Sequence, residues 1–235
     1  MSSFVLVHGA CHGAWCWYKV KARLEARGHT VLALDMPGHG IDRMSIEEVT
    51  LAHIVARVGE TIAAAAEPVV LVGHSYGGIA ITQAAEYFTD KIRKLVYVAA
   101  VLVPNGVAAA GIDTCDSALT RHTIAPADRK VTQFDHTIVN EALYGECGAD
   151  DIALARTLLV PEAVAGLMTP VQTSAQGFGR VPRIYIECAK DRAITLTSQR
   201  KLQAALPCEQ VFTLDSDHSP FFSRPDELSA ILADI

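Results

Sequence analysis

The amino-acid sequence predicts an α/β protein with a mostly parallel sheet that carries helices on both faces. Short apolar runs such as residues 4–8, 30–35 and 69–73 alternate with segments of helical character, and the runs show no polar face. Strands that are apolar on both faces are typical of parallel sheets covered by helices. The alternation stops near Val101 and returns at Val181. We therefore expect one α/β domain with an inserted segment.

Local signals place the individual elements. Gly28 is a natural stop for the first helix, and Ser45 with Glu48 predicts a capping box at the start of the second. Pro68 comes directly before a strand. The expected strands span residues 4–8, 30–35, 69–73, 92–100, 181–188 and 209–214. The expected helices span residues 15–26, 45–66, 76–87 and 196–206, and a last helix begins near residue 225.

The inserted segment covers residues 102–180 and lacks the strand–helix rhythm of its flanks. Helix candidates lie near residues 131–143 and 150–159, with Gly145 and Pro161 as breaks between elements. We interpret this segment as a small helical cap, so that residues 1–101 and 181–235 form the core of the domain.

Composition excludes several classes of protein. The 235 residues carry a net charge of −6, which predicts no general attraction to nucleic acid or to an anionic membrane. The longest apolar run, residues 95–103, is far shorter than the roughly 20 residues that a spanning helix needs. The N-terminus does not resemble a signal peptide, so we expect a cytoplasmic protein.

The cysteines give a second indication of the compartment. None of the six forms a C-x-x-C pair, which argues against a zinc or thioredoxin-type site. Their scattered positions favour free thiols in a reducing cytoplasm, although their even number leaves disulfides open. They are Cys11, Cys16, Cys115, Cys147, Cys188 and Cys208.

The most informative motif is G-x-S-x-G, formed by Gly73, Ser75 and Gly77. It stands directly after an apolar strand and directly before a helix, which is the context of a nucleophile elbow. Small residues are needed on either side of the serine because the backbone turns sharply there. The alternative is a glycine-rich turn with an incidental serine. The elbow interpretation predicts the α/β-hydrolase fold with Ser75 as nucleophile.

A serine hydroxyl needs a positioned base, and in this fold an acid and then a histidine follow the serine along the chain. His218 lies on the loop after the last expected strand, and Asp191 follows the strand before it. They are the predicted base and acid. The alternative is that both are polar residues of surface loops.

Other histidines and carboxylates compete for these roles. The side chain of His74 is expected to diverge from Ser75, and His122 and His136 are expected at the surface. Asp215 and Asp217 adjoin His218 too closely to reach its far ring nitrogen, so we interpret them as loop-shaping or solvated. Glu187 is expected inside a strand.

Two backbone N–H groups are candidates for an oxyanion hole. Gly9 ends the first strand, so the N–H of Ala10 can face the same cleft as the N–H of Tyr76. The alternative for the His8-Gly9 pair is a simple turn at the end of a strand. Neither a G-x-G-x-x-G loop nor a cluster with metal-ligand spacing is found in the sequence, so no cofactor and no metal are expected.

Three stretches resemble plant methylesterases and hydroxynitrile lyases: residues 4–17, residues 28–35 and residues 181–186, together with the elbow. The resemblance implies an α/β-hydrolase enzyme, and the shorter, divergent cap suggests a bacterial member. Some lyases of this family carry threonine or asparagine at the position of Gly9, and one group carries lysine at the position of Ser219. This chain has the glycine of the esterases.

These observations together predict a serine carboxylesterase that acts on a small-molecule ester through an acyl-enzyme, without nucleic-acid or membrane partners. The resemblance also allows a homodimer. The alternatives are cyanohydrin cleavage, a non-catalytic receptor on the same fold, and hydrolysis of lactones, amides or carbon–carbon bonds. The candidate pocket residues are Gly9, His12, Trp15, Phe134, Leu143, Tyr144, Leu158, Leu167, Met168, Phe178 and Ser219.

Overall fold

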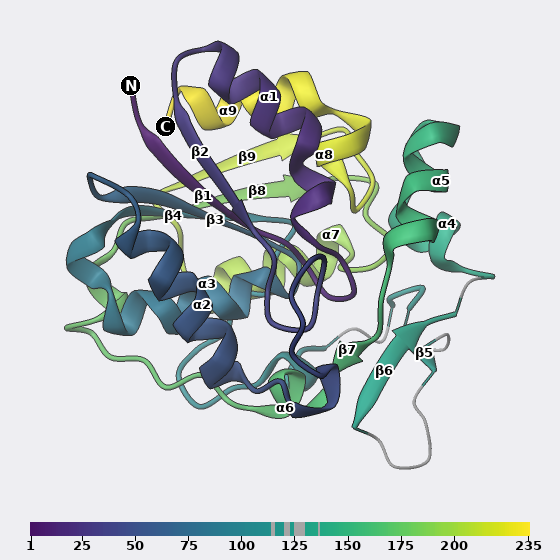
Figure 1. Ribbon diagram of the computed structural model, residues 1–235, viewed down its shortest axis with the longest axis horizontal. Coiled ribbons are helices and arrows are strands. Elements are labelled where there is room, and N and C mark those ends of the chain that lie inside the picture. Colours follow the sequence, from purple (N-terminus) through teal and green to yellow (C-terminus); the bar gives the residue numbers. More distant parts are fainter. Residues whose placement is uncertain (114–115, 120–122, 125–129, 136) are drawn as a thin grey trace.

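The chain folds around a six-stranded parallel sheet (Figure 1). The computed structural model describes residues 1–113, 116–119, 123–124, 130–135 and 137–235. The strand order is β2-β1-β3-β4-β8-β9, and every neighbouring pair is parallel. The bounds are β1 Ser3–Val7, β2 Thr30–Leu34, β3 Val69–His74, β4 Ile92–Val98, β8 Arg183–Cys188 and β9 Gln210–Leu214. The predicted α/β-hydrolase architecture is confirmed.

Helices cover both faces of this sheet (Figure 1). Alternate residues of β1 separate the two sides, because Phe4 and Leu6 pack in one apolar cluster while Val5 and Val7 pack in the other. The first cluster also holds residues of α1, α8 and α9, and the second holds residues of α2 and α3, with α7 against it. The bounds are α1 Tyr18–Ala26, α2 Leu51–Ala63, α3 Gly77–Tyr87, α7 Leu196–Ala205, α8 Pro220–Ser223 and α9 Pro225–Ala233.

The expected start of the second helix is wrong. Ser45 comes before a short 3₁₀ helix, η2 (Ile46–Glu48), and its side chain makes no capping hydrogen bond. Val49 is extended, which separates η2 from α2. Thr50 is the true N-cap: its side chain accepts from the N–H of His53, and the His53 ring accepts from the N–H of Thr50 at 3.3 Å. The usual sequence pattern of a capping box has Glu or Gln at the position of His53, so this capping box does not match the pattern.

Strands β4 and β8 are neighbours, and the chain between them lies outside the main sheet. It contains α4 Val139–Leu143 and α5 Ala149–Leu158, which overlap the two helix candidates, and a further short helix, α6 Val164–Met168, that the sequence did not indicate. The helix expected near residues 131–143 is wrong at its start, because Val131–Phe134 forms strand β6 between β5 (Thr123–Ile124) and β7 (Glu162–Ala163). The β-branched Val131 and Thr132 suit a strand. The division into core and cap stays a prediction.

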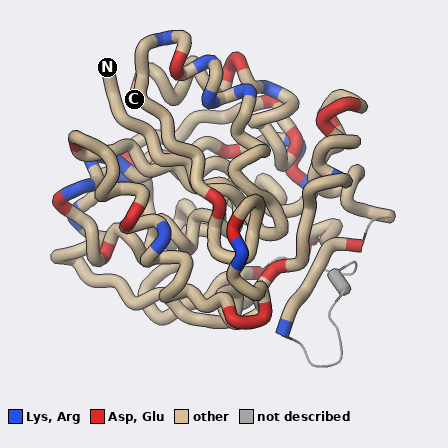
Figure 2. Tube along the Cα trace, viewed as in Figure 1, with Lys and Arg blue, Asp and Glu red and all other residues tan. Residues whose placement is uncertain are grey.

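Charge is dispersed over the outside of the molecule. Figure 2 shows basic and acidic residues intermixed over the outer helices and loops. None of the helices in the described ranges is long and apolar enough to cross a bilayer.

Candidate active site

Ser75 lies on a sharp turn between β3 and α3, at the carboxyl edge of the sheet. Its φ of 51° is left-handed, a conformation that costs a non-glycine residue energy and persists where the surroundings enforce it. Its carbonyl accepts from the N–H of Gly78 at 3.0 Å and of Val101 at 2.9 Å. Close packing explains the flanking glycines: a Cβ on Gly73 would lie 2.7 Å from the carbonyl oxygen of Gly77, and one on Gly77 would lie 2.6 Å from that of His8.

His218 and Asp191 meet at the same edge of the sheet. The Nδ1 atom of His218 lies 2.7 Å from Oδ2 of Asp191, and the two side chains are 2% and 0% exposed. The other carboxylate oxygen, Oδ1, accepts from the N–H groups of Ala193 at 2.7 Å and Ile194 at 2.9 Å. A buried carboxylate held by N–H donors suits Nδ1–H donation from the imidazole, which leaves Nε2 able to accept a proton.

His74 connects the elbow to the loop of His218. Its Nε2–H donates to the carbonyl of His218 at 2.8 Å, and the two rings lie 4.7 Å apart between centroids. Burial, followed by the charges of His218 and His12, holds the pKa of His74 well below its usual range. His74 therefore stays neutral, and it holds the main chain of His218 beside the elbow.

Ala10 and Tyr76 line the same cavity as Ser75. Among the described residues, neither backbone N–H of this pair has a hydrogen-bond partner. Gly9 packs against the elbow, because a Cβ there would lie 2.8 Å from the Cβ of Ser75. Two free N–H groups beside a serine hydroxyl are the arrangement that stabilises an oxyanion.

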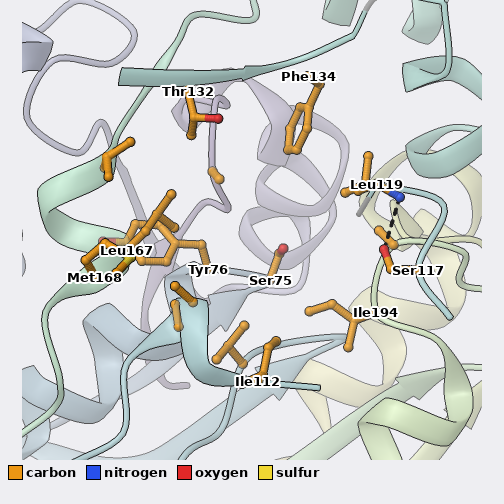
Figure 3. Close-up of a pocket in the computed structure, with 16 residues that line it drawn as sticks. Ser75, Tyr76, Ile112, Ser117, Leu119, Thr132, Phe134, Leu167, Met168 and Ile194 are labelled. Atoms are coloured by element: carbon orange, nitrogen blue, oxygen red, sulfur yellow. Dashed lines mark hydrogen bonds between the residues drawn. The ribbon is translucent and has the colours of Figure 1, made fainter. Parts of the chain in front are cut away.

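The cavity above Ser75 has a volume of about 550 Å³. Figure 3 shows the Ser75 hydroxyl directed into the space that the labelled residues enclose. Of the predicted pocket residues, Phe134, Leu167 and Met168 line it. Sequence reasoning missed most of the wall: Val101, Ala109, Ala110, Ile112, Ser117, Leu119, Thr132, Val164, Ala193 and Ile194. Position in the chain could have identified three of them, because Val101, Ala193 and Ile194 follow the carboxyl ends of β4 and β8.

Three of the other predicted pocket residues, namely buried His12 and Tyr144 and half-buried Trp15, contact one another beside Ala10 instead. Tyr144 and Nε2 of His12 are hydrogen-bonded at 2.7 Å, and the His12 ring stacks on Trp15 at 5.4 Å. Nδ1 of His12 contacts the carbonyl of Ala10 at 2.7 Å. Burial lowers the pKa of His12 to about 4, so its ring is neutral at pH 7.

The remaining predicted pocket residues also lie away from the cavity wall. Leu143 and Phe178 are buried in the two apolar clusters, where packing accounts for them. Leu158 is 37% exposed at the end of α5. Ser219 is buried at the start of α8. Gly9 contacts the elbow from behind rather than the cavity.

The rival carboxylates have structural partners. Asp217 is buried and shapes the loop, because it accepts from the N–H groups of Glu146 at 2.8 Å and Ser219 at 3.2 Å. Asp215 is exposed and pairs with Lys190 at 3.0 Å. Glu187, on β8, pairs with Arg200 at 2.9 Å. The rival histidines His122 and His136 lie outside the described residues.

The cysteines of the described ranges are free thiols: Cys11, Cys16, Cys147, Cys188 and Cys208. Cys115 lies outside those ranges. Burial raises the pKa of the Cys11 and Cys16 thiols well above the usual value, so neither is a reactive thiolate near the elbow. No group of His, Cys, Asp and Glu side chains suited to a metal ion occurs in the described part of the chain.

Comparison with known proteins shows the family of the chain. The model of the alpha/beta hydrolase family matches residues 4–231, and the chain belongs to that family. It is 35% identical to methylesterase 7 of Arabidopsis thaliana, over 99% of this chain and 95% of the relative. It is 36% identical to norfluorocurarine synthase 2 of Strychnos, over 99% and 94% of the two chains.

The solved structures lead to the same group. The crystal structure of a methylesterase from Arabidopsis superposes with a TM-score of 0.87 at 31% identity, covering 100% of this chain and 98% of the other. The resemblance to plant methylesterases that the sequence indicates is therefore confirmed.

Proposed function

We propose that this protein is a serine carboxylesterase, with Ser75 as nucleophile, His218 as general base and Asp191 as the group that orients the base. The observation that carries the proposal is the buried 2.7 Å contact between His218 and Asp191 beside an elbow whose serine faces an apolar cavity. The methylesterase relatives support the choice of an ester.

In the first step, the Ser75 oxygen forms a bond to the ester carbonyl carbon while its proton passes to Nε2 of His218. The carbonyl electron pair moves onto oxygen, and the N–H groups of Ala10 and Tyr76 stabilise the negative charge. Asp191 stabilises the imidazolium. The bond from carbon to the alcohol oxygen then breaks, and the alcohol leaves with the proton from His218, so that an acyl-Ser75 remains.

In the second step, a water molecule replaces the alcohol. His218 takes a proton from the water, whose oxygen attacks the acyl carbon. The carbonyl oxygen again carries the negative charge toward the two N–H groups. The bond to Ser75 breaks, the serine oxygen regains a proton from His218, and the carboxylic acid is released.

The cavity wall favours a neutral, apolar ester. No charged side chain lines it among the described residues, so a charged substituent would lose its hydration without gaining a partner. Cyanohydrin cleavage fits less well. Position 219 is a serine rather than the lysine of one lyase group, and a side chain on Gly9 would displace Ser75 or His74.

A substrate panel tests this proposal. We expect turnover of p-nitrophenyl butyrate and of neutral aryl methyl esters, with at least ten-fold lower kcat/KM for a half-ester of succinate. Release of cyanide from mandelonitrile should not exceed the uncatalysed rate. Enzymatic cyanide release without ester turnover would show that the protein is a lyase and not an esterase. Tight binding of these esters without turnover would indicate a receptor.

We also propose a reducing, cytoplasmic location. The free thiols of Cys11, Cys16 and Cys188 support it, because proteins exported to oxidising compartments commonly pair their cysteines.

A further inference from the structure

We propose that Glu162, on the inserted segment, is a positioning residue for the oxyanion hole: its buried carboxylate holds the main chain at Cys11 and thereby aims the N–H of Ala10. This inference rests on the proposed function. Nothing in the sequence pattern singles out Glu162, which sits on β7, far along the chain from the first strand.

The inserted segment holds Cys11 through both its backbone N–H and its backbone carbonyl. Its N–H donates to Oε2 of Glu162 at 3.2 Å, and its carbonyl accepts from the N–H of Val160 at 3.0 Å. Its φ of 64° is left-handed, which is unfavourable for a cysteine unless the surroundings enforce it. Glu162 and Val160 supply this restraint one residue beyond the candidate oxyanion donor.

The carbonyls of the two preceding residues, Gly9 and Ala10, are held by histidine side chains instead. Nδ1 of His8 lies 2.8 Å from the carbonyl of Gly9, and Nε2 of His8 accepts from the N–H of Met36 at 3.0 Å. Nδ1 of His12 lies 2.7 Å from the carbonyl of Ala10. Each carbonyl from Gly9 to Cys11 is thus engaged. Glu162 completes the loop by holding the N–H of Cys11, and the N–H of Ala10 is left for a ligand.

The carboxylate of Glu162 has polar partners although it is buried. Its side chain is fully buried and lies 3.2 Å from Nε2 of His39, and Oε1 accepts from the N–H of Ala163 at 2.9 Å. Burial lowers the pKa of His39, but the adjacent carboxylate of Glu162 outweighs this effect, so the pKa is raised. Nδ1 of His39 contacts the carbonyl of Pro37 at 3.0 Å, which fixes the ring. These contacts fix the position of the Glu162 carboxylate beside Cys11.

Loss of Glu162 should therefore impair the transition state more than substrate binding. Complete removal of one oxyanion donor typically costs about 10²–10³ in kcat. The N–H of Ala10 would remain but lose its fixed direction, so we expect Glu162→Ala to lower kcat about 10–100-fold, with KM changed less than about three-fold. In Glu162→Gln a single amide oxygen is left for the N–H groups of Cys11 and Ala163, so the loss should be smaller.

The experiment measures kcat and KM for p-nitrophenyl butyrate and the inhibition constant of a butyl trifluoromethyl ketone, which forms a tetrahedral oxyanion on a nucleophilic serine. The variants are wild type, Glu162→Ala, Glu162→Gln and the control Glu86→Ala. Glu86 accepts from the N–H groups of Ser174 and Phe178 at 2.8 and 3.0 Å, remote from the elbow. The glutamine variant is nearly isosteric and gives the answer if the alanine variant does not fold.

Support requires that ketone affinity falls by the same factor as kcat/KM in the Glu162 variants and stays near wild type in Glu86→Ala. Equal losses in the Glu162 and Glu86 variants, or a Glu162→Gln enzyme with reduced kcat and unchanged ketone affinity, would overturn the inference. If Ser75→Ala keeps wild-type turnover, the proposed function itself fails, and that result is distinct from either outcome at Glu162.

Discussion

Ser75→Ala is expected to lower kcat for p-nitrophenyl butyrate by about 10⁴–10⁶-fold, because the atom that forms the acyl-enzyme bond is lost. The residual rate should come from the cavity and the two backbone N–H groups alone. Alanine is tolerated at the elbow for steric reasons, and the backbone contacts of Ser75 with Val98, Gly78 and Val101 do not involve the hydroxyl. Initial rates at saturating ester measure the effect.

Ser117 provides the matched control because it is another serine on the wall of the same cavity. Its hydroxyl accepts from the N–H of Leu119 at 3.1 Å, and Ser117→Ala should keep kcat within about ten-fold of wild type. If both alanine variants lose activity equally, the loss reports damage to the cavity rather than removal of a nucleophile.

Asp191→Asn should lower kcat by about 10⁴-fold with little effect on KM. Asparagine can still accept from the N–H groups of Ala193 and Ile194 through one oxygen. It would then present an NH₂ group to Nδ1 of His218, so the imidazole would adopt the tautomer whose Nε2 carries the proton. That tautomer cannot take the proton of Ser75. Steady-state kinetics at pH 7 measure the change.

Asp215→Asn is the corresponding control in the loop of His218. Its carboxylate is exposed and pairs with Lys190, and exposed ion pairs contribute little to stability. Activity within about two-fold of wild type is expected. Near-wild-type turnover by Asp191→Asn, with the Asp215 variant also active, would show that the base needs no carboxylate at position 191.

The parts of the site that follow from chain order were predictable. Ser75, Asp191 and His218 each stand just after an apolar run, and the carboxyl ends of parallel strands meet at one edge of the sheet. The two helix-covered faces were also predictable, because the strands are apolar on both faces. In β1, alternate residues pack in the two apolar clusters.

Features that depend on packing between distant segments were not predictable. Tyr144 and Phe178 are aromatic residues that the sequence suggested for the pocket wall, but they pack in the apolar clusters. The small side chains of Ala109 and Ala110 line the cavity instead. The strand of Val131–Phe134 depends on pairing with β5 and β7. Nothing in the sequence pattern singles out Glu162, and its buried carboxylate depends on contacts with Cys11 and His39, which are distant along the chain.

Trapping the nucleophile tests the central claim most directly. Wild-type protein treated with a short-chain alkyl fluorophosphonate should gain one phosphonyl group, and peptide mapping should place it on Ser75. Prior incubation with the trifluoromethyl ketone should slow the labelling, and His218→Ala should abolish it, because the serine then lacks a base. Stoichiometric labelling at any other residue, or labelling of Ser75 at an unchanged rate without His218, would contradict the account.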